Sequence, residues 1–146
     1  MTQKQRLLTV LMTLMLSVTG AWALDGSGTN SDPYQLGSVQ DWKDFAAIVN
    51  NGTNPAANAK MTADIDLGTD QTIIGSSTHP YAGVFDGQGH TLTVHLNSAS
   101  DGVAPFHSID GATIKNLAVA GSVTGTIHEH NGVRIICDSH NVLPLG

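Results

Sequence analysis

Short stretches with an apolar residue at every second position, separated by turns rich in Gly, Asn and Asp, constrain this chain more than any other feature. The clearest stretches are KMTADIDLG (60–68), TLTVHL (91–96) and, more loosely, ATIKNLAVAGSV (112–123). Successive side chains of a strand point to opposite faces, so each stretch predicts strand structure with one buried face.

The spacing of these stretches indicates a repeat. An apolar residue followed by Asp and soon by Gly occurs three times, and Ile65, Phe85 and Ile109 lie 20 and 24 residues apart. A near-constant period in this range is typical of solenoids, whose units bury their apolar faces against each other. We therefore expect an all-β fold, a parallel β-helix of about three coils, with a β-sandwich or jelly roll as the alternative.

The turn Asp86-Gly87-Gln88-Gly89 is expected to be a corner between two strands. Glycine supplies the positive φ that such a corner needs, and aspartate bonds nearby backbone. A phosphate-binding loop would be followed by a helix and a lysine, whereas residues 90–96 alternate like a strand and contain no lysine.

A helix is predicted ahead of the strands. Residues 24–37 form an extended lead-in, Ser38 is the expected N-cap with Asp41 close to a capping-box position, and Gly52 is the expected stop. The apolar face of this helix consists of Trp42, Phe45, Ala46 and Val49. Aromatic residues at helical spacing predict core packing here, rather than a sugar-binding platform.

The N-terminus predicts export. Residues 1–23 have a basic start, a short apolar stretch and a small-x-small ending at Ala23, which is the layout of a cleaved signal peptide. Its removal takes away Lys4 and Arg6 and moves the formal charge from −6 to −8. Such an acidic domain offers no basic patch that could bind nucleic acid. The single Cys137 cannot form an internal disulfide, so packing and backbone pairing must hold the fold.

Several segments, in this order, resemble the N-terminal part of bacterial surface proteins with GLUG-type repeats, often described as adhesins. The segments are DPYQLGSVQDWKDFAAIVNNG (32–52), KMTADIDLG (60–68), PYAGVFDGQGHTLTVHL (80–96) and GVAPFHSIDGATIKNLAVAGSVTG (102–125). The resemblance implies a right-handed β-helix over residues 38–125 with the helix as its N-terminal cap. It also implies a secreted or cell-surface location and no enzyme chemistry.

The chain departs from that pattern after Gly125. Instead of further repeats it continues with TIHEHNGVRIICDSHNVLPLG (126–146), in which the alternation fades. We expect residues 126–146 to be an atypical tail from a truncated gene, with further coils missing. The alternative is that the tail covers the last coil.

Two carboxylates raise a rival hypothesis, a carbohydrate-active enzyme of the polysaccharide hydrolase or lyase type. Asp64 and Asp66 are predicted on one outward strand face, roughly 6.5–7 Å apart. Inverting glycosidases place their two carboxyl groups at about 6.5–9.5 Å and need one of them with a raised pKa. A solvated pair on an alternating strand is the simpler interpretation.

Two metal sites were weighed and neither is predicted. The tail carries donors suited to Zn²⁺, whose spacing fits no structural zinc site: His128, His130, Cys137 and His140. If Asp66, Asp86 and Asp110 occupied equivalent corners they would stack roughly 4.8 Å apart and could share Ca²⁺, although aspartate as a turn former is the preferred explanation.

The remaining histidines, His79, His90, His95 and His107, show no partner pattern in the sequence, and no G-x-S-x-G motif indicates a nucleophile. We therefore expect an exported structural or adhesive module without catalysis or cofactor. It would bind a glycan or a host surface protein through its exposed strand face and turns, with no membrane span after signal cleavage.

Overall fold

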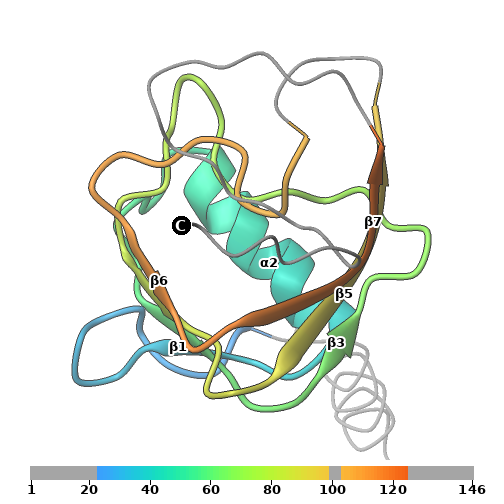
Figure 1. Ribbon diagram of the computed structural model, residues 1–146. Coiled ribbons are helices and arrows are strands. Elements are labelled where there is room, and N and C mark those ends of the chain that lie inside the picture. Colours follow the sequence, from blue (N-terminus) through green and yellow to red (C-terminus); the bar gives the residue numbers. More distant parts are fainter. Residues whose placement is uncertain (1–22, 99–102, 125–146) are drawn as a thin grey trace, which may run out of the picture.

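Two small parallel sheets and one helix make up the regular structure of the computed structural model, which describes residues 23–98 and 103–124 (Figure 1). The first sheet has the order β1 (Tyr34–Leu36), β2 (Ala59–Met61), β4 (Val84–Asp86) and β6 (Thr113–Lys115). The second has the order β3 (Ile65–Asp66), β5 (Thr91–Asn97) and β7 (Ala118–Thr124). The helix α2 (Val39–Asn50) lies between β1 and β2 in sequence.

The prediction of an all-β, right-handed parallel β-helix is wrong. The described residues form two separate sheets with a helix in the core, a mixed α and β arrangement, and they do not close into a solenoid. The strands are parallel as expected, but the described residues of the segments 67–83 and 98–112, which would have to close the coils, form no named strand. These described residues pair with one another only at isolated bridges, Ile74 with Phe106 and Tyr81 with Ile109. Proline and glycine, as in Pro80 and Pro105, interrupt ladder pairing there.

The alternating stretches are strands, but corners divide two of them. KMTADIDLG contributes β2 to the first sheet and β3 to the second, with a corner at residues 62–64. ATIKNLAVAGSV contributes β6 and β7, and Asn116 turns the chain between them with φ 53°. The expected corner at residues 86–89 is confirmed, since it joins β4 to β5. The lead-in predicted at residues 24–37 contains β1.

The helix begins and ends where the sequence predicted. The Ser38 hydroxyl accepts a hydrogen bond from the Asp41 N–H at 3.1 Å, and the Asp41 carboxylate accepts one from the Gly37 N–H at 3.0 Å. The reciprocal bond of a capping box is thus made one residue earlier than usual. At the other end Gly52, with φ 74°, donates to the Val49 carbonyl.

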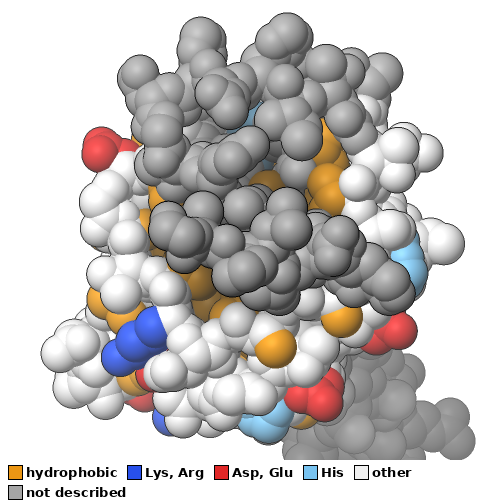
Figure 2. All heavy atoms as spheres, viewed as in Figure 1, with side chains coloured by type: hydrophobic (Ala, Val, Ile, Leu, Met, Phe, Trp, Pro, Cys, Tyr) orange, Lys and Arg blue, Asp and Glu red, His pale blue; other side chains and the backbone are white. Residues whose placement is uncertain are grey.

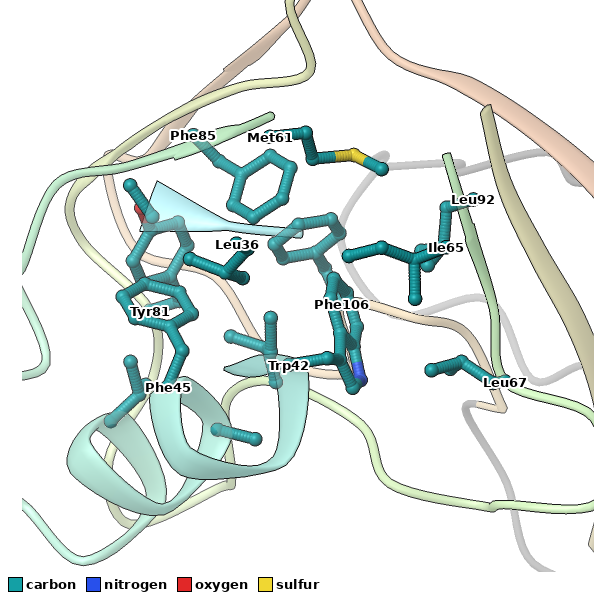
Figure 3. Close-up of a cluster of buried hydrophobic side chains, with 14 of the residues drawn as sticks. Leu36, Trp42, Phe45, Met61, Ile65, Leu67, Tyr81, Phe85, Leu92 and Phe106 are labelled. Carbon is teal, nitrogen blue, oxygen red and sulfur yellow. The ribbon is translucent and has the colours of Figure 1, made fainter. Parts of the chain in front are cut away.

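The core is an aromatic cluster between α2 and the strands (Figure 3). Its six members are all the aromatic residues of the described ranges: Tyr34, Trp42, Phe45, Tyr81, Phe85 and Phe106. Phe85 meets Phe106 at 5.0 Å and Trp42 at 6.0 Å between ring centroids, with steep angles that favour edge-to-face attraction. Trp42 and Phe45 are fully buried, so the core interpretation is confirmed.

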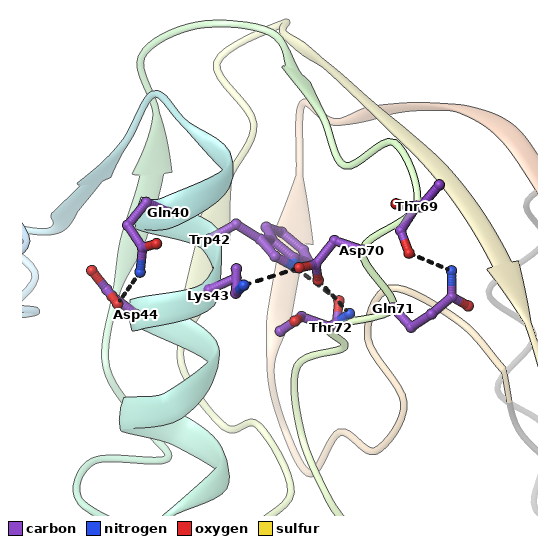
Figure 4. Close-up of polar contacts among 8 residues, drawn as sticks. All are labelled: Gln40, Trp42, Lys43, Asp44, Thr69, Asp70, Gln71 and Thr72. Atoms are coloured by element: carbon purple, nitrogen blue, oxygen red, sulfur yellow. Dashed lines mark hydrogen bonds and ion pairs between the residues drawn. The ribbon is translucent and has the colours of Figure 1, made fainter.

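Polar contacts tie α2 to the segment after β3 (Figure 4). The Trp42 indole N–H donates to the Thr72 carbonyl at 2.9 Å, and Lys43 Nζ lies 3.1 Å from the Asp70 carboxylate. About two turns further along the helix, the Asn50 amide donates to the Ile73 carbonyl and accepts from the Gly75 N–H. The helix therefore covers its end of the two sheets in a fixed orientation.

Replacing Phe85 by alanine should remove the centre of the aromatic cluster. Phe85 is fully buried, and truncating such a side chain costs about 3–5 kcal/mol of unfolding free energy. Urea denaturation measures the loss. Ile114→Ala is the matched control, because Ile114 pairs with Phe85 in the next strand but is only partly buried, and it should cost clearly less. Equal losses would contradict the central role of Phe85.

Substitutions of the two glycines in the corner at residues 86–89 should differ in their cost to stability. A Cβ on Gly87 would lie 2.5 Å from the Asn116 oxygen and 2.6 Å from the Leu117 Cα, so Gly87→Ala forces backbone apart and should cost about 1–3 kcal/mol. Gly89 has φ 79° and no atom within 4 Å of such a Cβ, and in the next corner Asn116 also adopts a positive φ, 53°.

Gly89→Asn should therefore cost less than about 1 kcal/mol, because asparagine adopts this conformation readily. Both variants can be compared by thermal denaturation. A Gly89→Asn variant less stable than Gly87→Ala would show that conformation, and not crowding, limits this corner.

Candidate binding face

The side chains that point outward from the second sheet form a polar face, which we call the outer face. The parallel register pairs Leu92 with Ile65 and with Val119, so the apolar row turns inward and the alternate residues turn outward. The outer face consists of Asp66, Thr91, Thr93, His95, Asn97, Ala118, Ala120, Ser122 and Thr124, with Asp64 at its corner.

The outer face is ordered in rows across the strands. Thr93 pairs with Asp66 on one side and Ala120 on the other, and the next rows pair His95 with Ser122 and Asn97 with Thr124. Partners in a row are roughly 4.8 Å apart, and successive rows roughly 6.6 Å. Short hydroxyl, amide and imidazole groups are thus presented on a regular grid.

Gln71 completes this face where β3 ends. β3 has two residues and β5 has seven, so the far part of β5 has no strand beside it on that side. The Gln71 side chain donates to the His95 carbonyl at 2.7 Å and accepts from the Asn97 N–H at 2.8 Å. Its amide makes the two bonds that a neighbouring strand would make, which keeps this edge of β5 satisfied.

Two histidines have partners that the sequence did not reveal. His95 Nδ1 lies 3.2 Å from the Ser122 hydroxyl, and His90 Nδ1 lies 3.1 Å from the Asp64 carboxylate. The partners are 27 and 26 residues apart, so only the strand register brings them together. Within residues 23–98 and 103–124 no carboxylate contacts His95, and both His95 and Ser122 are exposed, an arrangement unlike that of an activated serine.

Asp64 and Asp66 do lie at the same end of the outer face, but the surroundings of Asp64 favour its ionised form, whereas a general acid must be protonated. Asp64 accepts hydrogen bonds from the Thr91 N–H at 2.9 Å and from His90, and these bonds lower its pKa below the ordinary value. Its side chain is 73 % exposed. Asp66 is also exposed and accepts from the Gly68 N–H within its own turn. A glycosidase acid needs a raised pKa, which this setting does not give Asp64.

The proposed stacking of Asp66, Asp86 and Asp110 is not observed. Asp66 pairs with Thr93 in the second sheet, whereas Asp86 pairs with Lys60 and Lys115 in the first. Asp86 accepts from the Gln88 N–H and the Asn116 amide, as a turn former does, and the Asn116 bond is the larger cause of its lowered pKa.

The described part of the chain holds no group of three or more residues able to bind a metal ion. The four zinc candidates, His128, His130, Cys137 and His140, lie outside the described residues, as do residues 1–22 of the predicted signal peptide.

Comparisons of the chain with protein-family models, curated proteins and solved structures gave no match. Among the described residues, α2 is the only helix, and it is too short and too polar to cross a membrane.

Replacing Asp64 by asparagine should change how stability depends on pH. The lowered pKa of Asp64 means that the unfolded chain takes up this proton at a higher pH than the folded chain. The stabilisation by this carboxylate is therefore complete well above pH 3.8 and disappears as the pH falls through the lower folded pKa.

Thermal denaturation of Asp64→Asn between about pH 7 and pH 2.5 should show a loss that is largest near neutrality and vanishes in acid. Asp66→Asn is the control two residues away, because within the described residues the Asp66 carboxylate accepts its hydrogen bond from its own turn. A loss for Asp64→Asn that stayed constant down to the acid limit would contradict the assignment.

Proposed function

We propose that this protein is an exported, non-catalytic surface module of structural or adhesive type, which binds its ligand through the outer face. The observation that carries the proposal is the grid of short side chains on β3, β5 and β7, most of them polar and all of them exposed or half-buried. The signal-peptide pattern and the resemblance of residues 32–125 to GLUG-type surface proteins support export and display at a bacterial cell surface.

The outer face has the properties of a preorganised binding surface. Its backbone is held by continuous pairing from Thr91 with Ala118 to Asn97 with Thr124, so little conformational freedom is lost when a ligand binds. Its side chains are short, which keeps their own ordering cost small. A surface of this kind suits a ligand with regularly repeated hydroxyl or amide groups, and a glycan chain is the ligand class that we propose.

Charge argues for the same ligand class. The outer face carries Asp64 and Asp66 at one corner and no lysine or arginine among its members. A neutral glycan is compatible with such a surface, whereas a phosphate-rich or strongly acidic polymer is repelled. A host surface protein remains the other partner class from the sequence, and the binding assay below separates the two.

A long cation in the centre of the grid should block binding. Ser122 and Thr113 are both exposed hydroxyl residues on the last strand of a sheet, the first on the outer face and the second on the other sheet. Ser122→Lys and Thr113→Lys therefore make the same change of charge at two comparable positions. Binding to an immobilised neutral polysaccharide should fall at least about tenfold, or about 1.4 kcal/mol, for Ser122→Lys only.

Equal losses for the two variants would contradict an outer-face site, and binding to host cells stripped of glycans would favour a protein partner.

The same assay tests the enzyme alternative, because a hydrolase or lyase releases soluble fragments and Asp64→Asn with Asp66→Asn would abolish that release. Fragment release that depends on these carboxylates would overturn the non-catalytic proposal.

A further inference from the structure

The two ends of the sheets are buried to different extents. In the inward row of the first sheet, Phe85 of β4 is fully buried while its partner Ile114 of β6 is only partly buried. The second sheet repeats the pattern, since Leu92 and Val94 of β5 are fully buried and Val119 of β7 is not. Further hydrophobic residues packed at this end are also only partly buried: Val103, Ile109, Ala112, Leu117 and Val123.

The opposite end is covered by a helix. There α2 lies against β1, its Trp42 and Phe45 are fully buried, and the Asp25 and Gly28 carbonyls accept backbone hydrogen bonds from the Gln35 and Asn58 N–H groups. Within the described ranges, no element covers the β6–β7 end in this way. Figure 2 views the molecule from that side and shows hydrophobic side chains on this face.

β7 also presents a long strand edge. It has seven residues, the same length as β5, and among described residues no strand pairs with it on its far side. Natural edge strands are commonly protected by lysine, proline or a covering segment. β7 reads AVAGSVT and carries neither lysine nor proline. Of these three kinds of protection, only a covering segment can therefore apply to β7.

We infer that residues 125–146 of this same chain dock on the β6–β7 end and shield its apolar row and the β7 edge. The segment starts at the edge it would cover, because Thr124 is the last residue of β7. Tethering makes docking intramolecular, so its effective concentration exceeds that of a second copy in solution.

Chain length supports the same occupant. The chain returns from the second sheet to the first through residues 67–83 and 98–112, which are 17 and 15 residues long. A connection of the shorter length, residues 125–139, would bring the chain back over β6. It contains the apolar residues needed to cover an apolar row, among them Val133, Ile135 and Ile136.

Cys137 allows the inference to be tested in the full-length chain, because it is the only cysteine. Ser122→Cys places a second thiol on β7, and Gln40→Cys places one on the exposed face of α2 at the other end. A short bifunctional maleimide should join Cys137 to position 122 within one chain and should leave position 40 unjoined. Mass analysis separates internal links from covalent dimers.

Hydrogen exchange gives an independent measurement on variants in which the sequence of β7 is unchanged. Ile135→Asp with Ile136→Asp should speed exchange of the β6 and β7 amides by about tenfold or more while leaving β1 and β2 unchanged. His128→Asp with His130→Asp introduces the same two carboxylates into the same segment and should have a smaller effect on β7.

Three results would overturn the inference. Equal linking of positions 122 and 40 would show that the segment has no preferred site. Identical exchange in the two double variants would show that its apolar residues do not matter. Covalent dimers at position 122, with a sedimentation coefficient that rises with concentration, would identify a second copy as the occupant.

Discussion

Packing of aromatic rings against one another holds the helix and the strands together in this protein. Phe85 comes from β4, Trp42 and Phe45 from α2, and Phe106 and Tyr81 from the two segments between the sheets. No internal disulfide is available to a chain with one cysteine, and each strand of the first sheet has only three residues. Burial of these rings therefore supplies the stabilisation that strand pairing of this length does not.

Tyr81 shows how the cluster tolerates a polar group. Its ring is fully buried, and its hydroxyl donates to the Ala57 carbonyl at 3.0 Å. Burial raises the pKa of this phenol, so it stays neutral and keeps donating at pH values at which an exposed phenol ionises. Trp42 is satisfied in the same manner by Thr72, and both bonds reach residues of connecting segments. The cluster thus positions loops as well as strands.

The helix and the inward rows were predictable because local periodicity determines them. Trp42 and Phe45 recur at helical spacing, and Leu92, Val94 and Leu96 alternate, so burial on one side follows from the sequence. The corner at residues 62–64 was not predictable, because the alternation of Met61, Ala63, Ile65 and Leu67 continues through it without interruption. The same continuity made two short sheets resemble the sides of one closed coil.

The candidate binding face was only half visible in the sequence. Alternation placed Asp64 and Asp66 outward, but the pairs of His90 with Asp64 and of His95 with Ser122 depend on register across 26 and 27 residues. The signal that could have found the second pair is the same 27-residue offset that aligns Leu92 with Val119. The first pair has a different offset of 26 residues, because Asp64 lies in a corner. Gln71 gave no signal, since an isolated glutamine in a loop does not reveal which backbone it will bond.

The three corners between the sheets differ in length, with three residues at 62–64, four at 87–90 and two at 116–117, yet the parallel register on both sides of them is continuous. The inward rows therefore set the alignment of the strands, and the corners adjust their length to it. Single-residue insertions and deletions should consequently accumulate in these corners over evolutionary time, whereas the same change inside β5 would turn every later side chain of the strand to the wrong face.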